Sequence, residues 1–168
     1  ICMNSKYPYT DSINNGLKLK IIDHTTNNLI KSRFHTEEIN YNWGTGQILD
    51  SGKSDNVILE FTGFIKVPNT KNYTFRTTSD DGVRLTINSD LIINDWTIHG
   101  ATNNDSGKIR LEKDIFYPIK LEYYEAGGGA VLRLLWKEEG TTNFVAVPVN
   151  VFCQLNNDSA KIRLEKDI

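Results

Sequence analysis

The sequence predicts an all-β fold, an antiparallel β-sandwich or barrel of roughly nine or more strands. Short runs of alternating apolar and polar residues recur along the chain, for example at 73–77 and 83–87. Gly, Asn, Asp and Pro bound these runs, and helical periodicity is almost absent. With 168 residues, 39% of them hydrophobic, the chain can bury the core of one domain.

Runs rich in β-branched and aromatic residues predict nine strands. In chain order they are residues 17–22, 57–67, 72–77, 82–88, 91–93, 108–112, 117–124, 131–137 and 145–149. Asn88-Ser89-Asp90 predicts a tight hairpin turn between two of them. Residues 24–56 show the least regular pattern, so we expect loops there that wrap the barrel, with Tyr41 and Trp43 covering one of its ends.

The alternation also predicts which side chains face inward, because successive side chains of a strand point to opposite faces. The expected core residues are Ile58, Phe61, Tyr73, Phe75, Val83, Leu85, Ile87, Ile119, Leu121, Tyr123, Leu132, Leu134 and Trp136. The loops at one end of such a sandwich are the expected place for function.

Two cysteines, Cys2 and Cys153, stand near the two ends of the expected domain. Domain termini often lie close together, so a disulfide could join them and would imply secretion. Two unrelated thiols are the alternative. We expect the disulfide, because an exposed free cysteine is a liability, and we place the domain at residues 1–153. Ile1 is not a natural start, so we expect a trimmed N-terminus and a larger multidomain parent protein.

The chain contains one internal repeat, in which residues 103–115 recur as residues 156–168 with the single difference Gly107 to Ala160. A solenoid would need several copies at regular spacing. The repeat is therefore an assembly artefact or inert tail, a partial duplication, or a strand that replaces its twin in a neighbouring molecule. We favour an artefact or an inert tail, and treat residues 154–168 as a C-terminal tail.

Composition excludes two classes of partner. The formal net charge is −2, so the chain lacks the basic surface that nucleic acid requires. No apolar run approaches the roughly 18 residues needed to span a membrane, so we expect no membrane insertion.

The hairpin tip at Ser79-Asp80-Asp81-Gly82 carries two adjacent carboxylates where a tight turn needs one Asp-Gly at most. Paired carboxylates repel each other, and a cation would offset that repulsion. Neighbouring side chains on a strand point to opposite faces, so both reach one ion only if the backbone is locally twisted, as a cis peptide would allow.

A second loop, Glu125-Ala126-Gly127-Gly128-Gly129-Ala130, offers the complementary half of an oxygen cage. Glu125 adds a carboxylate, and the glycines let carbonyl oxygens point toward one centre. Calcium takes six to eight oxygen ligands in flexible geometry. Either half alone is more often a plain turn, and it is their combination in one β domain that predicts calcium.

Over residues 16–150 the chain resembles the protective-antigen-type (PA-fourteen) β-barrel family, found in toxins, glycosidases, adhesins and flocculins. The motifs that carry the resemblance are Asn42-Trp43-Gly44-Thr45-Gly46, Phe61-Thr62-Gly63-Phe64-Ile65, Tyr73-Thr74-Phe75, Ser79-Asp80-Asp81-Gly82-Val83-Arg84-Leu85, Ile92-Ile93-Asn94-Asp95-Trp96-Thr97 with His99-Gly100, and Tyr123 through Ala130.

The resemblance implies a calcium ion held by Asp80 and Asp81 across a cis peptide, by Glu125, and by backbone carbonyls near Gly127 and Gly129. In lectin members of the family, sugar hydroxyls bind that calcium directly. Lectin members often carry an amide where this chain has Glu125, and adhesins place a bulky residue near position 129. The third carboxylate should preserve calcium binding, whereas Gly129 leaves one side of the sugar site open.

The expected function is therefore calcium-dependent carbohydrate binding by a secreted or cell-surface, lectin-like or adhesin-like module. Its expected partners are glycans with terminal sugars, which Asp80, Asp81, Trp96, His99 and Gly128 would contact. Packing of Trp96 on the barrel and local hydrogen bonding of His99 is the alternative for those two residues. The alternative function is a structural or interaction module of a larger toxin or glycosidase, with a purely stabilising calcium.

An enzyme is not expected. Glycosidases need two carboxyl groups that face each other across a sugar, whereas Asp80 and Asp81 are neighbours on one tip. The sequence also shows no nucleophile elbow and no phosphate-binding glycine-lysine loop.

Overall fold

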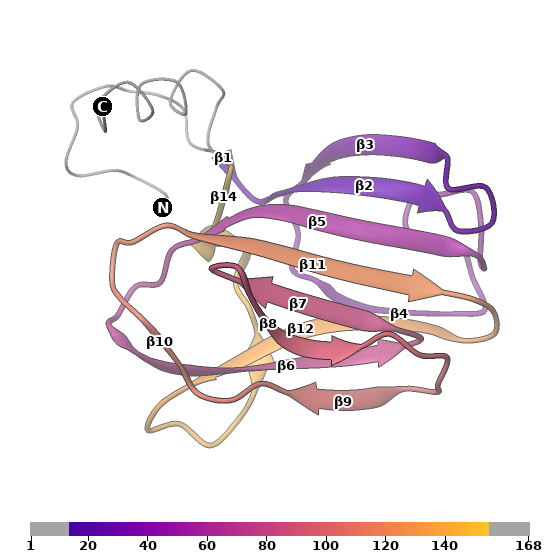
Figure 1. Ribbon diagram of the computed structural model, residues 1–168. Coiled ribbons are helices and arrows are strands. Elements are labelled where there is room, and N and C mark those ends of the chain that lie inside the picture. The colour runs from indigo at the N-terminus through magenta and orange to yellow at the C-terminus, as the bar shows by residue number, and fades with distance from the viewer. Residues whose placement is uncertain (1–13, 155–168) are drawn as a thin grey trace.

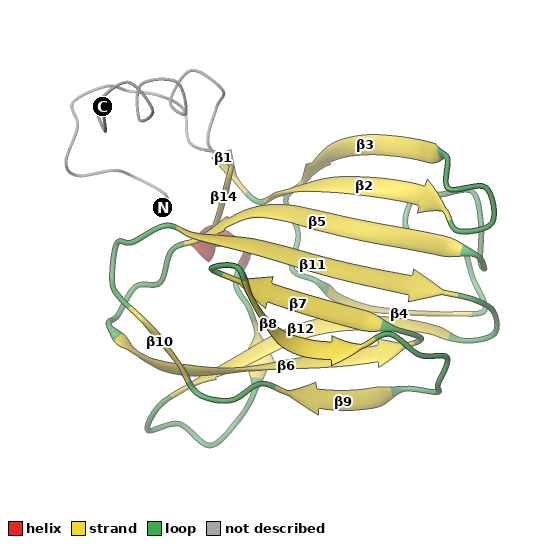
Figure 2. Ribbon diagram, viewed as in Figure 1, coloured by secondary structure: helices red, strands yellow, loops and turns green. Residues whose placement is uncertain are grey.

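The computed structural model describes residues 14–154, which form two antiparallel β-sheets packed face to face (Figure 1). This range holds fourteen strands and one short 3₁₀ turn, η1 (Val149–Val151), and no α-helix (Figure 2). Within it, no helix has the length and apolar character needed to cross a membrane. The predicted fold class, an antiparallel all-β sandwich, is confirmed.

The larger sheet is built around β5, which pairs with β11 on one side and with β2 and β14 on the other. From β11 the sheet continues through β7 to β8, while β3 extends it beyond β2 and β1 beyond β14. Its strands are β1 (Asn14–Asn15), β2 (Leu17–Asp23), β3 (Leu29–His35), β5 (Val57–Ile65), β7 (Val83–Ile87), β8 (Asp90–Asp95), β11 (Tyr117–Glu125) and β14 (Phe152–Gln154).

The smaller sheet is built around the long pair β6 and β12. Strands β9 and β10 follow one another along the outer edge of β6, and β4 and β13 do the same along β12. Its strands are β4 (Asn40–Gly44), β6 (Lys71–Asp80), β9 (Thr102–Asp105), β10 (Ile109–Leu111), β12 (Ala130–Glu138) and β13 (Val145–Ala146).

The core lies between the two sheets and follows the predicted alternation closely. All of the expected core residues are buried except Ile58, which is only half-buried. On β5 the inward positions are Val57, Leu59 and Phe61, so Ile58 falls on the opposite face by strand parity. In the smaller sheet, the rings of Tyr73 and Trp136 stack at 4.9 Å between centroids.

The expectation of loops across residues 24–56 is wrong in part, because β3 and β4 lie within that range. Most side chains of β3 are exposed, so this edge strand carries no apolar alternation that a sequence pattern could reveal. Tyr41 and Trp43 of β4 stack on each other at 4.8 Å and pack against the core, in agreement with their expected covering role.

The turn at Asn88 and Ser89 has positive φ at both residues, 52° and 69°, as a two-residue hairpin that follows the twist of its strands requires. This confirms the predicted turn and fixes how β7 returns into β8.

Cys153 is buried on β14 and is disulfide-bonded. Its expected partner Cys2 lies outside the described residues, so their pairing stays a prediction. Strand β14 ends at Gln154, one residue beyond the expected domain boundary. The repeated residues 156–168 also lie outside the described range.

Truncation of Leu121 tests the alternation on β11. Leu121 is fully buried and lies opposite Phe61 on one neighbouring strand and Leu85 on the other. Leu121→Ala should lower the free energy of unfolding by about 2–5 kcal/mol, because it leaves a cavity in the core. The matched variant Glu122→Ala, on the opposite face, should stay within about 1 kcal/mol of the wild type. Urea denaturation measures both, and equal losses would contradict the assigned faces.

Candidate metal centre

Three carboxylates meet at one end of the sandwich. Ligand oxygens of Asp80, Asp81 and Glu125 all lie within 4.8 Å of one another. The peptide bond between Asp80 and Asp81 is cis, as the sequence led us to expect. The two loops that were predicted to form complementary halves are therefore side by side.

Strand pairing explains how the two halves meet. Asp80, the last residue of β6, lies opposite Val131 of β12, and Val83, the first residue of β7, lies opposite Tyr123 of β11. The β6–β7 tip is therefore not the expected hairpin, because its two strands belong to different sheets. It connects the two sheets beside the loop that joins β11 to β12. Ladder hydrogen bonds on either side of this tip hold it at one end of the sandwich.

Asp81 ties two loops together. Its Oδ1 accepts the backbone N–H of His99 at 3.0 Å, and its Oδ2 accepts that of Ala126 at 2.9 Å. The side chain is buried, and both partners belong to loops rather than to the sheets. This carboxylate therefore sets the position of the loop after β8 relative to the loop after β11.

Glu125 is fully buried but only partly satisfied. The Tyr123 hydroxyl lies 3.1 Å from Glu125 Oε2 and 2.6 Å from the carbonyl oxygen of Asp80. A phenol has one proton, so it cannot donate to both acceptors at full strength. Among the described residues, no group forms a well-shaped hydrogen bond with Glu125 Oε1, and the backbone of Gly127 only partly offsets the rise in the pKa of Glu125. A buried, unsatisfied carboxylate oxygen costs free energy unless a cation or a proton joins it.

In the part of the chain that the structure describes, basic side chains do not balance the charges at this centre. Within residues 14–154, no Lys or Arg forms an ion pair with Asp80, Asp81 or Glu125. Burial, together with the charges of Asp81 and Asp80, raises the pKa of Glu125 to about 7. Burial and the Asp81 charge also raise the pKa of Asp80. The donor set, carboxylate oxygens with one orphaned acceptor, fits a hard cation such as calcium.

The glycine loop borders this centre on its open side. Gly128 is exposed with φ +106°, and its N–H donates to Oδ1 of Asp55 at 3.1 Å. A Cβ at Gly129 would come to 3.7 Å from Asp80 Oδ2, so position 129 directly flanks the cluster. Carbonyl ligation by Gly127 and Gly129 stays a prediction.

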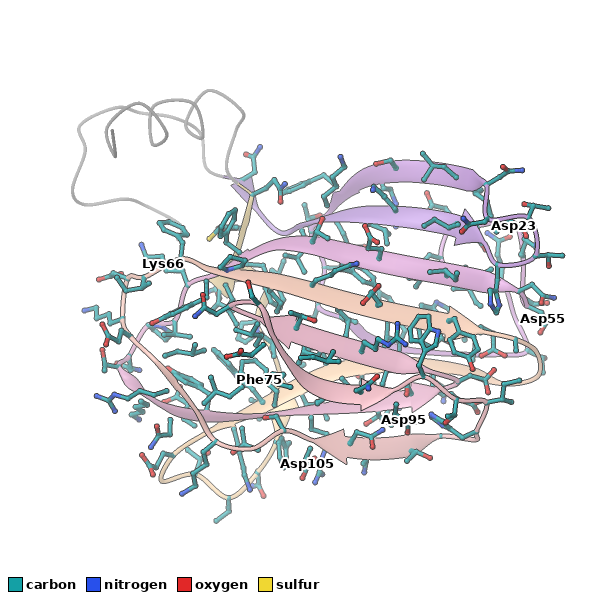
Figure 3. The ribbon with its side chains drawn as sticks, in the orientation of Figure 1. Asp23, Asp55, Lys66, Phe75, Asp95 and Asp105 are labelled. Carbon is teal, nitrogen blue, oxygen red and sulfur yellow. The ribbon has the colours of Figure 1, made fainter. Side chains whose placement is uncertain are left out.

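Asp55 is a site residue that sequence reasoning missed. It sits in the irregular stretch before β5, and it reaches the glycine loop because Val57 of β5 pairs with Glu125 of β11. Figure 3 shows Asp55 at the end of the sandwich where the loops meet. Only this pairing register, which no local motif encodes, could have revealed it.

Trp96 packs on the sandwich. Its indole lies 4.5 Å from the Arg84 guanidinium and 4.8 Å from the Tyr124 ring, and it is half-buried. Most of the Trp96 surface is therefore packed on the sandwich, which is the alternative that the sequence analysis gave for this residue. Tyr124 itself requires Gly82, because a Cβ at position 82 would overlap the tyrosine ring.

His99 and Asp95 organise the loop after β8. The ring of His99 has Nδ1 2.8 Å from the carbonyl oxygen of Gly100 and Nε2 3.2 Å from Asp95 Oδ2. Asp95, which Figure 3 labels near the end of β8, also accepts from Thr97 at 2.7 Å and from Asn104 at 3.0 Å. Through these contacts Asp95 holds the loop. The contacts of His99 are local hydrogen bonds, which the sequence analysis gave as the alternative to sugar binding, and its backbone lies beside Asp81.

The raised pKa of Glu125 predicts an unusual pH dependence of the metal-free protein. A carboxyl group with a folded pKa of about 7 and an unfolded value of 4.5 contributes stability below 4.5 that is lost as pH rises through 7. The wild type in chelator should therefore lose up to about 3 kcal/mol between pH 4.5 and 8 relative to Glu125→Gln. Denaturant unfolding across this range measures the difference, and parallel curves for the two proteins would refute the assignment.

Comparisons with known proteins identify the family of this chain. The PA14 domain family matches residues 14–149. Anti-sigma-I factor RsgI3 of Acetivibrio thermocellus is 34% identical over 116 residues, which are 69% of this chain but only 18% of that protein. The chain thus spans less than a fifth of this curated relative.

Two solved structures share the fold. An anti-sigma factor domain-containing protein from Clostridium clariflavum superposes with a TM-score of 0.76 at 27% identity, covering 90% of this chain and 52% of that one. The Epithelial Adhesin 6 A domain of Candida glabrata, solved in complex with Galb1-3GlcNAc, gives 0.75 at 14% identity, covering 90% and 92%. From the match over residues 14–149 we conclude that the chain belongs to the PA14 domain family.

Proposed function

We propose that this chain is a calcium-dependent carbohydrate-binding module of a larger protein. The observation that carries the proposal is the buried cluster of Asp80, Asp81 and Glu125 with its unsatisfied oxygen, at a loop end bordered by exposed glycines. Membership of a family with an adhesin structure solved with a bound disaccharide supports the same interpretation.

Asp80, Asp81 and Glu125 would hold the ion, with carbonyl oxygens of Gly127 and Gly129 completing the protein ligands. Bound calcium would supply the positive charge that attracts adjacent hydroxyl groups of a sugar. Asp80 is the most exposed of the three carboxylates, so a sugar would approach from its side.

The glycine loop leaves one side of this site open. A Cβ added at Gly128 would meet no atom within 4 Å, and Gly129 presents no side chain toward Asp80. The edge of Trp96 and the ring of His99 would line the remaining side. An open site around one ion favours weak binding of single sugars, so adhesion would depend on several modules acting together.

A secreted or cell-surface location fits this function. Cys153 is disulfide-bonded, and disulfides persist mainly in oxidising compartments. Glycans exposed on polysaccharides or glycoproteins would be the partners there. The three clustered carboxylates are not arranged for opposed acid and base roles across a sugar, which supports a binding function rather than hydrolysis.

The second candidate is a structural module whose calcium only stabilises the fold. It is favoured by Asp81, whose two backbone hydrogen bonds join loops whether or not a sugar is present. The anti-sigma factor relatives, of which such a domain forms only a part, are compatible with that role.

Calorimetric titration of calcium tests the metal step. Wild-type protein should bind one ion, and Glu125→Gln should bind it at least about tenfold more weakly, because it loses a charged ligand. Asp81→Asn should lose more, since an amide leaves one of two loop N–H groups facing another donor. Asp90→Asn, which changes an exposed carboxylate on β8, is the matched control and should bind like the wild type. Absence of heat with wild-type protein would exclude the calcium site.

A glycan array probed with calcium and again with chelator separates the two candidate functions. Carbohydrate binding predicts signals that appear with calcium and vanish with chelator, and that Asp80→Asn abolishes. Calcium binding by calorimetry without any calcium-dependent glycan signal would instead favour the structural module.

A further inference from the structure

The repeat at residues 156–168 copies a segment whose structural role is now visible. The original, residues 103–115 (the resident segment), supplies most of β9 and all of β10, the two strands that cover the outer edge of β6 (Figure 1). Asn103 lies opposite Thr78, and Leu111 lies opposite Lys71. The copy therefore has the sequence of an edge strand of this sheet.

Side chains fix the resident segment in its register. Asp105 accepts two hydrogen bonds from Arg76, at 2.6 and 2.9 Å, and its position at the end of β9 is labelled in Figure 3. Thr78 donates to Asn103 at 2.7 Å. Ser106 Oγ accepts the Phe75 N–H at 2.9 Å.

Leu111 adds the apolar anchor of the resident segment, since it is 1% exposed. The corresponding residues of the copy are chemically identical at every one of these contacts. They are Asn156 for Asn103, Asp158 for Asp105, Ser159 for Ser106 and Leu164 for Leu111.

The single difference between the two segments is compatible with the same conformation. A Cβ added at Gly107 meets no atom within 4 Å, and the φ of Gly107 does not lie in the left-handed region. Ala160 could therefore occupy this position without a clash or backbone strain. Residues 156–168 carry every determinant needed to dock on β6.

The path of the chain disfavours docking of the copy at that position in its own molecule. The resident segment starts beside Thr78 and ends beside Val67, whose carbonyl accepts the Asp114 N–H at 3.4 Å. Lys66 in turn donates its N–H to Val151, just before β14. The chain thus leaves β14 at the end of the sandwich where the resident segment finishes, not where it starts.

The remaining distance is long compared with the reach of the connecting residues. Thr78 lies seven residues along β6 from Lys71, or about 23 Å in a strand. Only two steps separate Gln154, paired in β14, from Asn156, and two extended residues span about 7 Å at most. These spans favour docking on the β6 edge of a second molecule over in-register docking in the same chain.

We propose that residues 156–168 of one molecule dock on β6 of a second copy and replace its resident segment, so that the chain forms strand-exchanged dimers or longer assemblies. The exchange breaks the contacts of the resident segment with β6 and forms the same contacts with the copy. The protein concentration therefore sets the ratio of monomers to exchanged assemblies. A resident segment held within its own chain competes at an effective concentration of about millimolar. Exchange should accordingly grow with protein concentration.

One substitution placed in either segment gives a matched test on the full chain. Leu111→Ala weakens the resident segment alone and should raise the dimer fraction at a fixed concentration by roughly tenfold or more. Leu164→Ala weakens the copy alone and should lower the dimer fraction below that of the wild type. Sedimentation velocity measures both. An inert tail predicts no effect of Leu164→Ala, and that result, or equal effects of the two variants, would overturn the proposal.

Ser106→Ala and Ser159→Ala form a milder pair for use if Leu111→Ala unfolds the domain, and they should act in the same opposite directions. Disulfide trapping tests the register independently. Thr78→Cys combined with Asn156→Cys should yield covalent dimers under mild oxidation, several times more than Thr78→Cys combined with Asn157→Cys, whose side chain falls on the other face. Equal dimer yields on a non-reducing gel would contradict docking in the register of Asn103.

Discussion

One buried carboxylate, that of Asp81, holds the functional end of this molecule together. Its two oxygens accept the N–H groups of His99 and Ala126, which belong to two different loops. Without a side-chain acceptor at this point, two backbone donors would be left without a partner near the protein interior. Asp81 therefore positions two loops, the glycine loop and the loop after β8 that carries Trp96 and His99.

The same arrangement creates an electrostatic cost that the protein alone does not relieve. Asp81 is committed to the loops, Glu125 is buried with an orphaned oxygen, and Asp80 lies close to both. Protonation of Glu125 relieves part of the repulsion, which is why burial and neighbouring charge raise its pKa to about 7. A divalent cation would relieve more of it, since it would supply two positive charges and a partner for the orphaned acceptor together. The cost of the metal-free state is thus what would favour metal binding at this end of the fold.

Sequence reasoning succeeded where a signal is local and periodic, and failed where contact depends on register. Alternation located the inward residues of β6, β7, β11 and β12. Each of these strands is paired on both edges, and only one of its two faces packs on the core and is apolar. Alternation missed β3, an exposed edge strand without such a face. It also misassigned Ile58, because three adjacent apolar residues, Val57 to Leu59, leave the strand parity ambiguous. At the site, the doubled aspartate and the glycine run are visible in the sequence, whereas Asp55 meets Gly128 only through the pairing of β5 with β11.

Strand β6 carries Asp80 at its end and the resident segment along its outer edge, so it takes part both in the proposed metal site and in the proposed strand exchange. Strand exchange at that edge would link the proposed calcium sites of two molecules and leave the three carboxylates of each in their own chain, because β9 and β10 supply none of them. An open site that binds single sugars weakly gains most from such linkage, since a second binding event becomes intramolecular once the first has occurred. The repeated segment would then raise avidity for a multivalent glycan while leaving the chemistry of each site to Asp80, Asp81 and Glu125.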